Sequence, residues 1–276
     1  MKKFSWLVVF TLVLCGAGKA QAMDNEFILG GGYWSSDLAK GNFAYGEDVL
    51  WIDGEYSPGI GIYGMIESGE SKVSDYTWDG QLVGPQIGFK HTWASASDYH
   101  DAKNMPVWLE RQWLVKLRYV WEKTNGENPT TGYWMKQSNT KLGLYAENVD
   151  ELSPKLKLII TAEGWLTLSK ERESSWSGDQ PESRDQAAAG LYLQYKFAEP
   201  ISVRAGLGPF YQAWDKMTGI NVRGEVRLYE HVMVGAYVSF FPFGLSDTYT
   251  DLSTDLGTEV KESNLTTTGI FARIEF

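Results

Sequence analysis

Basic side chains stand at alternate positions of otherwise apolar segments, and they define the chemistry that the chain could perform. The candidates are Lys116, Arg118, Arg204, Arg223 and Arg227. In an extended strand, residues two apart lie on the same face, so these charges share one face while apolar residues share the other. A charged face of this kind can attract, orient and select polar solutes through its electric field.

Acidic and aromatic residues occupy the same polar phase of other segments. The acids are Asp53, Glu55, Glu67, Glu163 and Glu225, and the aromatic residues are Trp51, Tyr63, Trp165 and Tyr192. Acids lean toward the early segments and bases toward the late ones, which predicts an acidic arc facing a basic arc. Aromatic faces with polar edges can stack on sugar rings. The alternative is that the charges pair with one another and the aromatic rings pack, so that the interior is filled.

Catalysis is not expected from these residues. Acid–base or nucleophilic catalysis usually needs a histidine beside a serine or a carboxylate. The chain has three histidines, of which His91 falls on an apolar face while His100 and His231 fall in connectors. The acids of segment 244–264 lack the spacing of a calcium loop. We therefore expect no enzyme, no metal site and no cofactor.

Alternating apolar and polar positions recur along the chain and predict about twelve strands, with ten or fourteen as other possible totals. The expected strands are 26–36, 46–56, 59–68, 83–93, 108–122, 139–148, 155–168, 186–198, 200–212, 219–230, 232–243 and 265–276. Nine aromatic residues fall on the apolar phase, mostly near strand ends, as in the aromatic girdles of membrane barrels. They are Tyr33, Trp93, Trp113, Tyr119, Trp121, Tyr195, Phe197, Tyr211 and Phe276.

The expected connectors alternate between short and long. The short ones contain Ser57-Pro58-Gly59, Ser153-Pro154, Glu199-Pro200 and Glu230-His231, and the long ones are 69–82, 123–138, 169–185 and 244–264. This alternation is typical of an antiparallel transmembrane barrel with tight turns on one side and long loops on the other. The connector 94–107 departs from the pattern, because it is long although it falls where a short turn is expected.

The N-terminus has the pattern of a secretory signal peptide. Lys2 and Lys3 precede a short apolar run, which is followed by a small-residue stretch that ends in Ala20-Gln21-Ala22. We expect cleavage after Ala22, which removes Cys15, the only cysteine, and leaves residues 23–276 as one domain. No later stretch reaches the ~18 apolar residues of a membrane helix.

The last eight residues, GIFARIEF, form an alternating strand that ends on Phe276. In this feature and in its strand pattern, the chain resembles the Gram-negative outer-membrane β-barrel superfamily, although it resembles no single family within it. The resemblance implies an all-β, transmembrane, antiparallel up-and-down barrel in the outer membrane. It also implies contacts with outer-membrane lipid and lipopolysaccharide, and recognition of the final strand by the barrel assembly machinery. A soluble β-sandwich or lipocalin-like barrel would alternate in the same way, but its strands are usually shorter.

In such a barrel the polar phase faces the lumen. The resemblance and the charges together predict a porin-like channel for small hydrophilic solutes, including saccharides. A closed barrel whose acidic outer loops bind a partner is the alternative function. Nucleic acid is not an expected partner, because the formal net charge is −10.

Overall fold

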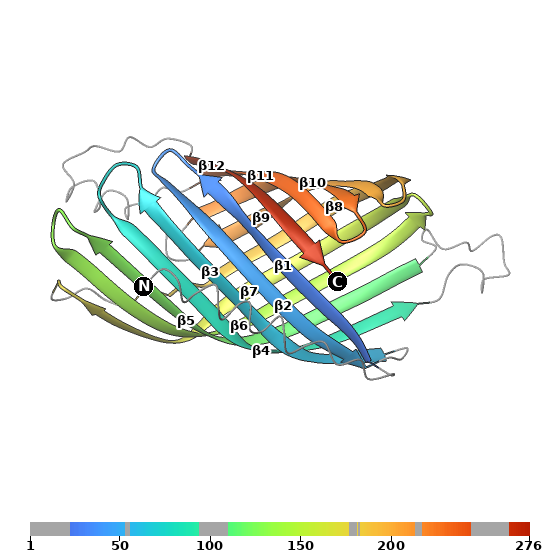
Figure 1. Cartoon of the computed structure of the whole chain (residues 1–276), viewed down its shortest axis with the longest axis horizontal. Coiled ribbons are helices and arrows are strands. Elements are labelled where there is room, and N and C mark those ends of the chain that lie inside the picture. Colours follow the sequence, from blue (N-terminus) through green and yellow to red (C-terminus); the bar gives the residue numbers. More distant parts are fainter. Residues whose placement is uncertain are drawn as a thin grey trace.

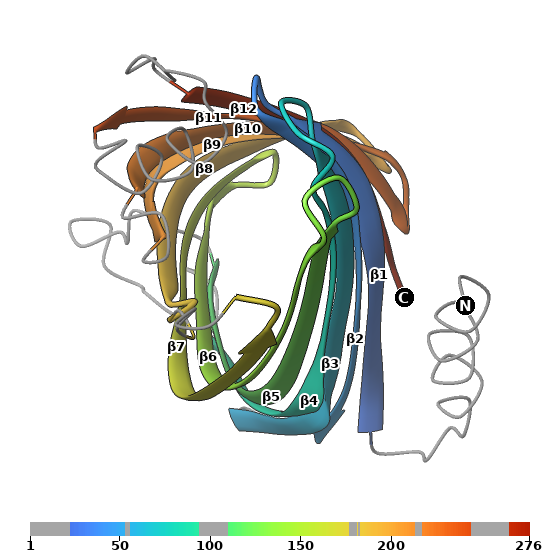
Figure 2. The ribbon, with the colours of Figure 1, turned by 90° about the vertical axis from the view of Figure 1, so that its left-hand side faces the viewer.

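Twelve antiparallel strands form one closed barrel in the computed structural model (Figure 1). The structure describes residues 23–52, 56–93, 110–176, 181, 183–212, 217–243 and 265–276. The strands are β1 (Met23–Ser35), β2 (Ala39–Ile52), β3 (Tyr56–Ser71), β4 (Thr77–Trp93), β5 (Glu110–Asn128), β6 (Tyr133–Ser153), β7 (Leu156–Ser174), β8 (Gln186–Ala198), β9 (Ile201–Gln212), β10 (Met217–Tyr229), β11 (Val232–Phe243) and β12 (Leu265–Glu275). Each strand pairs with its neighbours in sequence, and the ring is visible end-on in Figure 2. The predicted fold class and strand number are confirmed. The described residues contain no helix long and apolar enough to cross a membrane.

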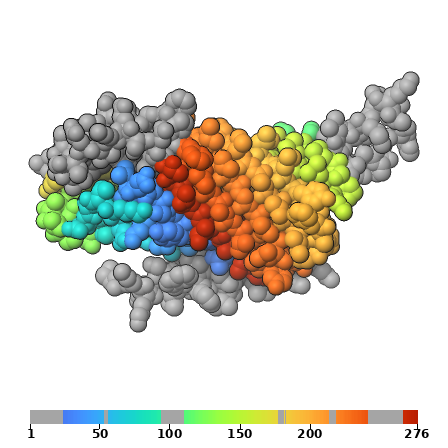
Figure 3. Space-filling model, turned by 90° about the horizontal axis from the view of Figure 1, so that it is seen from above, coloured from blue at the N-terminus to red at the C-terminus, as the bar shows by residue number. Residues whose placement is uncertain are grey.

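The ring closes between β1 and β12, which lie side by side in Figure 3 as the blue and red strands. Phe276 donates its backbone N–H to the carbonyl of Phe27 at 2.8 Å and accepts from the Phe27 N–H at 2.9 Å. The two rings stack with centroids 6.4 Å apart. These contacts pair both edge strands, so neither presents a free edge to lipid at this seam.

The outer surface carries a belt of exposed apolar side chains. On β5 this belt extends from Trp113 to Trp121, close to the ~9–11 residues that a tilted strand needs to cross a bilayer. All nine predicted girdle aromatics are exposed on this surface. Because the outward side chains are apolar and the inward ones polar, the barrel is arranged for lipid outside and polar groups inside.

Several predicted boundaries are wrong: β2 starts at Ala39 and not at 46, and β7 continues to Ser174, into the predicted loop 169–185. Ser57-Pro58-Gly59, expected as a turn, lies inside β3, and the β2–β3 register ends at Trp51 opposite Gly59, just before Pro58. A proline has no N–H to contribute to a ladder, and it is tolerated at Pro58 because the pairing with β2 has ended there. Most of the predicted loops 69–82 and 123–138 is strand, leaving only 72–76 and 129–132 between strands.

The physical reason for the errors in the predicted loops is the loss of apolar alternation above the belt. On β5 the outward residues after Trp121 are Lys123, Asn125 and Glu127, all exposed. The strand continues there through backbone pairing with β6 up to Asn128 opposite Tyr133. The β5–β6 hairpin consequently reaches the far left of Figure 1, at what we call the loop end. The opposite end, with the turns β6–β7, β8–β9 and β10–β11, is the turn end.

Candidate functional site

The barrel interior on the side of β1 to β7 holds a cluster of matched charges, which we call the paired cluster: Glu26, Glu47, Lys116, Arg118 and Glu163. Glu47 is its centre, because one carboxylate oxygen pairs with Lys116 and the other lies 2.7 Å from Arg118 Nη2. Glu26 Oε1 lies 2.9 Å from Lys116 Nζ, and Glu163 Oε1 lies 3.5 Å from Arg118 Nη1. Glu47, Lys116 and Arg118 are 3–6% exposed. Charges buried this deeply require close partners, and here they have them.

Aromatic rings hold Arg118 in position. Its guanidinium lies 4.1 Å from the centroid of the Tyr63 ring and 5.9 Å from that of Trp165. Its Nε donates to Gln86 at 3.2 Å. Ring faces and acceptors together therefore occupy most of the directions in which this side chain could interact.

Toward the loop end, an apolar layer separates the paired cluster from a second polar network. The layer consists of Tyr63, Leu82, Val120 and Trp165, with Met65 packed against it. Beyond it, Glu122 accepts from Asn139 at 2.5 Å and from Lys141 at 3.4 Å. Glu67 lies 3.8 Å from Arg184 in the same region. This half of the interior is thus packed with side chains that mostly pair with one another, although the buried Thr124 hydroxyl has no hydrogen-bond partner among the described residues.

The half formed by β9 to β12 has a different charge balance, and we call its charged residues the arginine wall: Arg204, Arg223, Arg227, Arg273, Glu225 and Glu275. Glu225, which is 3% exposed, lies 2.6 Å from Arg223 and 3.7 Å from Arg273. Glu275 lies 2.8 Å from Arg227 and 2.9 Å from Arg273. Within the described part of the chain, Arg204 has no carboxylate in ion-pair range. Four cations here share two carboxylates.

Several buried polar atoms of the arginine wall lack hydrogen-bond partners among the described residues. They are the Nε atoms of Arg204, Arg223 and Arg273 and the Oε2 atom of Glu225. Arg223 Nε lies 2.6 Å from Glu225 Oε1, yet its N–H is not directed at that oxygen, so this contact is an ion pair without a hydrogen bond. Buried donors without acceptors are costly unless water or a ligand satisfies them.

Inward aromatic rings lie flat over glycines of the neighbouring strand. Tyr192 stands opposite Gly206, Phe271 opposite Gly235, Trp165 opposite Gly143 and Trp51 opposite Gly59. A Cβ at Gly143 would lie 2.6 Å from the Trp165 ring, so a glycine is needed for the ring to lie there. The ring thereby covers the wall instead of projecting across the lumen, and its other face is available to a second group.

Most of the residues predicted to line the lumen do face it. Lys116, Arg118 and Glu163 belong to the paired cluster, while Arg204, Arg223, Arg227 and Glu225 belong to the arginine wall. Trp51, Tyr63 and Trp165 are buried, and Tyr192 lies under Arg204. Glu67 faces Arg184 toward the loop end. Asp53 and Glu55 lie outside the described residues.

The carboxylates that pair with the predicted basic residues are not all those that the arrangement of two facing arcs predicted. Lys116 and Arg118 are bound by Glu26 and Glu47, which sequence analysis did not select. Glu47 could have been found, because it shares the inward phase of Trp51 on β2. Glu26 could have been found only through its partner, since Trp51 donates its Nε1–H to it at 3.0 Å.

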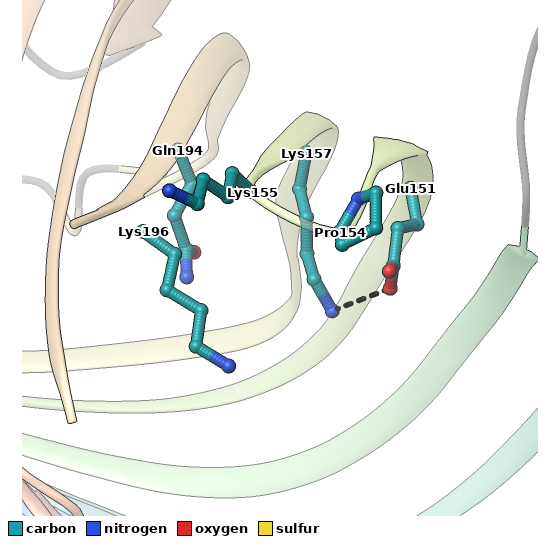
Figure 4. Close-up of a pocket in the computed structure, with 6 residues that line it drawn as sticks. All are labelled: Glu151, Pro154, Lys155, Lys157, Gln194 and Lys196. Atoms are coloured by element: carbon teal, nitrogen blue, oxygen red, sulfur yellow. Dashed lines mark ion pairs between the residues drawn. The ribbon is translucent and has the colours of Figure 1, made fainter. Parts of the chain in front are cut away.

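A small hollow at the turn end is lined by Glu151, Pro154, Lys155, Lys157, Gln194 and Lys196 (Figure 4). Two of its lysines have acidic partners. Lys157 lies 3.2 Å from Glu151, and Lys196 pairs with Glu199 in the β8–β9 turn. The hydrogen bond from Lys196, together with its charge, holds the pKa of the Glu199 carboxyl below its ordinary value. The hollow is thus an exposed rim with local charge pairs.

Histidines do not assemble a catalytic group in the parts of the chain that the structure describes. His91 lies among outward aromatic rings, stacked on Tyr56 with centroids 4.2 Å apart. His231 stacks on Phe276 at 5.1 Å. His100 lies outside the described residues. Among the residues described, no group of three or more His, Cys, Asp or Glu could hold a metal ion.

The barrel is similar to solved outer-membrane proteins. The translocator domain of the autotransporter NalP from Neisseria meningitidis aligns with a TM-score of 0.56 and 9% identity, covering 99% of this chain and 95% of that one. An outer-membrane channel from Pseudomonas putida F1 aligns with a TM-score of 0.51 and 11% identity, covering 95% of this chain and 98% of that one. The chain therefore has the fold of outer-membrane β-barrels, and identities this low show the fold alone. No family model and no curated protein sequence matches it.

Proposed function

We propose that this protein is an outer-membrane channel for small hydrophilic solutes, including saccharides. The observation that carries the proposal is the arginine wall, because its four arginines share two carboxylates and so leave positive charge for water or a solute. The apolar outer belt supports insertion in a membrane, and the fold shared with outer-membrane barrels supports the outer membrane as the location. Of the two similar structures, the one from Pseudomonas putida F1 is itself a channel.

The arginines that the flat aromatic rings hold in place support saccharides as one class of solute. Tyr192 covers Gly206 with one face and lies 4.5 Å from the Arg204 guanidinium with its ring centroid. The N–H groups of such ordered arginines, together with glutamate oxygens, can bind the hydroxyl groups of a sugar. In this proposal the residues act by binding and orientation, and the barrel catalyses no reaction.

A second function is favoured by the packing of the paired cluster and the networks beside it. If these side chains, together with the loops, close the lumen, the barrel instead presents its loop end to an extracellular partner. Among the described acids there, Glu70 lies 2.7 Å from Lys40 and Asp79 accepts from Asn125 at 2.7 Å, while the acids of 244–264 lie outside the described residues. The channel is therefore the better supported of the two functions.

Single-channel conductance of the refolded protein in planar bilayers tests the proposal. Folding is first verified by the mobility shift between heated and unheated samples and by the β-sheet circular dichroism spectrum. Steady conductance that is blocked by added oligosaccharides would support a channel that admits saccharides. Silence from verified barrels would overturn the channel and favour the surface-binding function.

A further inference from the structure

The arginine wall has more positive charge than its own carboxylates neutralise. Arg204 stands directly opposite Glu225 in the β9–β10 register, yet Glu225 pairs with Arg223 and Arg273 instead. Four arginines against two glutamates leave the equivalent of two unmatched cations. Such a surplus beside a low-dielectric wall attracts anions strongly.

Two of these arginines are held in place by a ring that itself lies on a glycine. The Arg204 guanidinium stacks on Tyr192 at 4.5 Å, and the Arg223 guanidinium stacks on Phe271 at 4.1 Å. Gly206 and Gly235 lie beneath the two rings. Stacking leaves the edge of a guanidinium, which carries its N–H donors, free to bind in the plane. Ordering these side chains beforehand lowers the entropy lost when a ligand binds.

The chain's own acid shows that this wall already holds a carboxylate beside its guanidinium groups. Glu225 is a carboxylate held beside Arg223 at 2.6 Å and near Arg273 at 3.7 Å, in a position where it is 3% exposed. A second carboxylate would complete the charge balance next to Arg204, which has no carboxylate in ion-pair range among the described residues. Guanidinium forks bind carboxylates in a planar, often bidentate geometry.

We infer that the arginine wall binds solutes that carry a carboxylate, with Arg204 and Arg223 as the principal ligands. The passage of such solutes rests on the proposed channel function, whereas their binding does not. The probe is glucuronate, which combines a sugar ring with a carboxylate, and its neutral counterpart is glucose. The carboxylate of glucuronate should be bound by the edge of the Arg204 guanidinium, which Tyr192 holds in place.

Titration calorimetry of the folded barrel in detergent measures binding without requiring an open pore. We expect glucuronate to bind, and glucose to bind at least about tenfold more weakly, because charge-assisted hydrogen bonds are the stronger kind. The double variant Arg204→Gln with Arg223→Gln should lose about tenfold or more in glucuronate affinity. Lys157→Gln is the control, because it removes a positive charge outside the arginine wall, at a turn-end residue that pairs with Glu151.

Three results would overturn the site. They are equal binding of glucose and glucuronate, an unchanged affinity in the double variant, and an equal loss in Lys157→Gln. If the double variant does not fold, the single variant Arg204→Gln replaces it, since Arg204 has no ion pair among the described residues to lose. Glucuronate binding without conductance would sustain the site and overturn the channel. Conductance without any preference for glucuronate would do the reverse.

Discussion

In the paired cluster two cations share three carboxylates, whereas in the arginine wall four cations share two. Both regions stack a guanidinium on an aromatic ring at 4.1 Å, in Arg118 on Tyr63 and in Arg223 on Phe271. The stacking device is therefore common to both, and the supply of carboxylates distinguishes them. Where there are enough carboxylates for the cations, the charged side chains pair with one another and fill the interior. Where there are too few, part of the positive charge remains available to a solute.

The largest effect is expected from Glu47→Gln in the paired cluster. This change leaves Lys116 and Arg118 buried without the charge that bridges them, which should lower the free energy of unfolding by ~3–5 kcal/mol. Urea unfolding of the barrel refolded in lipid vesicles measures it. Glu275→Gln is the matched control, because Glu275 also bridges two arginines but its side chain is 27% exposed, so its loss should cost about 1 kcal/mol or less. Equal losses would remove the energetic distinction between the two regions.

A second prediction concerns the glycines that both regions place beneath aromatic rings. Gly143→Ala should lower the free energy of unfolding by ~1–3 kcal/mol, because the new methyl group would displace the buried Trp165 ring. Gly224→Ala introduces the same group where nothing lies within 4 Å, and it should change stability by less than about 0.5 kcal/mol. Both variants are compared by urea unfolding. A similar loss in the two would show that backbone effects, not the ring, make glycine necessary.

Ion selectivity sharpens the comparison on the functional side. Replacing Arg223 and Arg227 together by glutamate should shift the channel toward cations by on the order of tenfold in permeability ratio. The reversal potential under a potassium chloride gradient reports the shift through its sign and size. Lys157→Glu at the turn-end rim serves as the control and should shift it less, because its surroundings are more exposed. An unchanged reversal potential in the double variant would count against a lumen controlled by the arginine wall.

The smallest effect is expected from the rim itself. Lys157→Gln removes a pair with Glu151 in which the lysine side chain is 41% exposed, so the free energy of unfolding should change by less than about 1 kcal/mol. Urea unfolding again provides the measurement. A loss as large as that from Glu47→Gln would mean that burial does not determine the strength of these pairs.

The sequence predicted the elements of the barrel better than the contacts of its interior. Alternation identified twelve strands and the outward aromatics, because lipid imposes a strict pattern on the outer face. It failed above the belt, where Lys123 and Glu127 face water and the strand persists only through backbone pairing. The partners of Lys116 could not be deduced either, since Glu26 and Glu47 reach it across the interior from non-neighbouring strands. Such contacts depend on side-chain length and on barrel shape, which no local pattern encodes.

The rings that lie on glycines also affect the width of the lumen. Twelve strands determine an approximate diameter, but Tyr192 over Gly206 and Phe271 over Gly235 determine how much of it the wall occupies. Each pair distributes its volume unequally across two strands, one residue giving a whole ring and the other nothing. Replacing both members of such a pair by residues of another size would widen or narrow the lumen locally without a change in strand number. Evolution can thus adjust the width of this barrel two residues at a time.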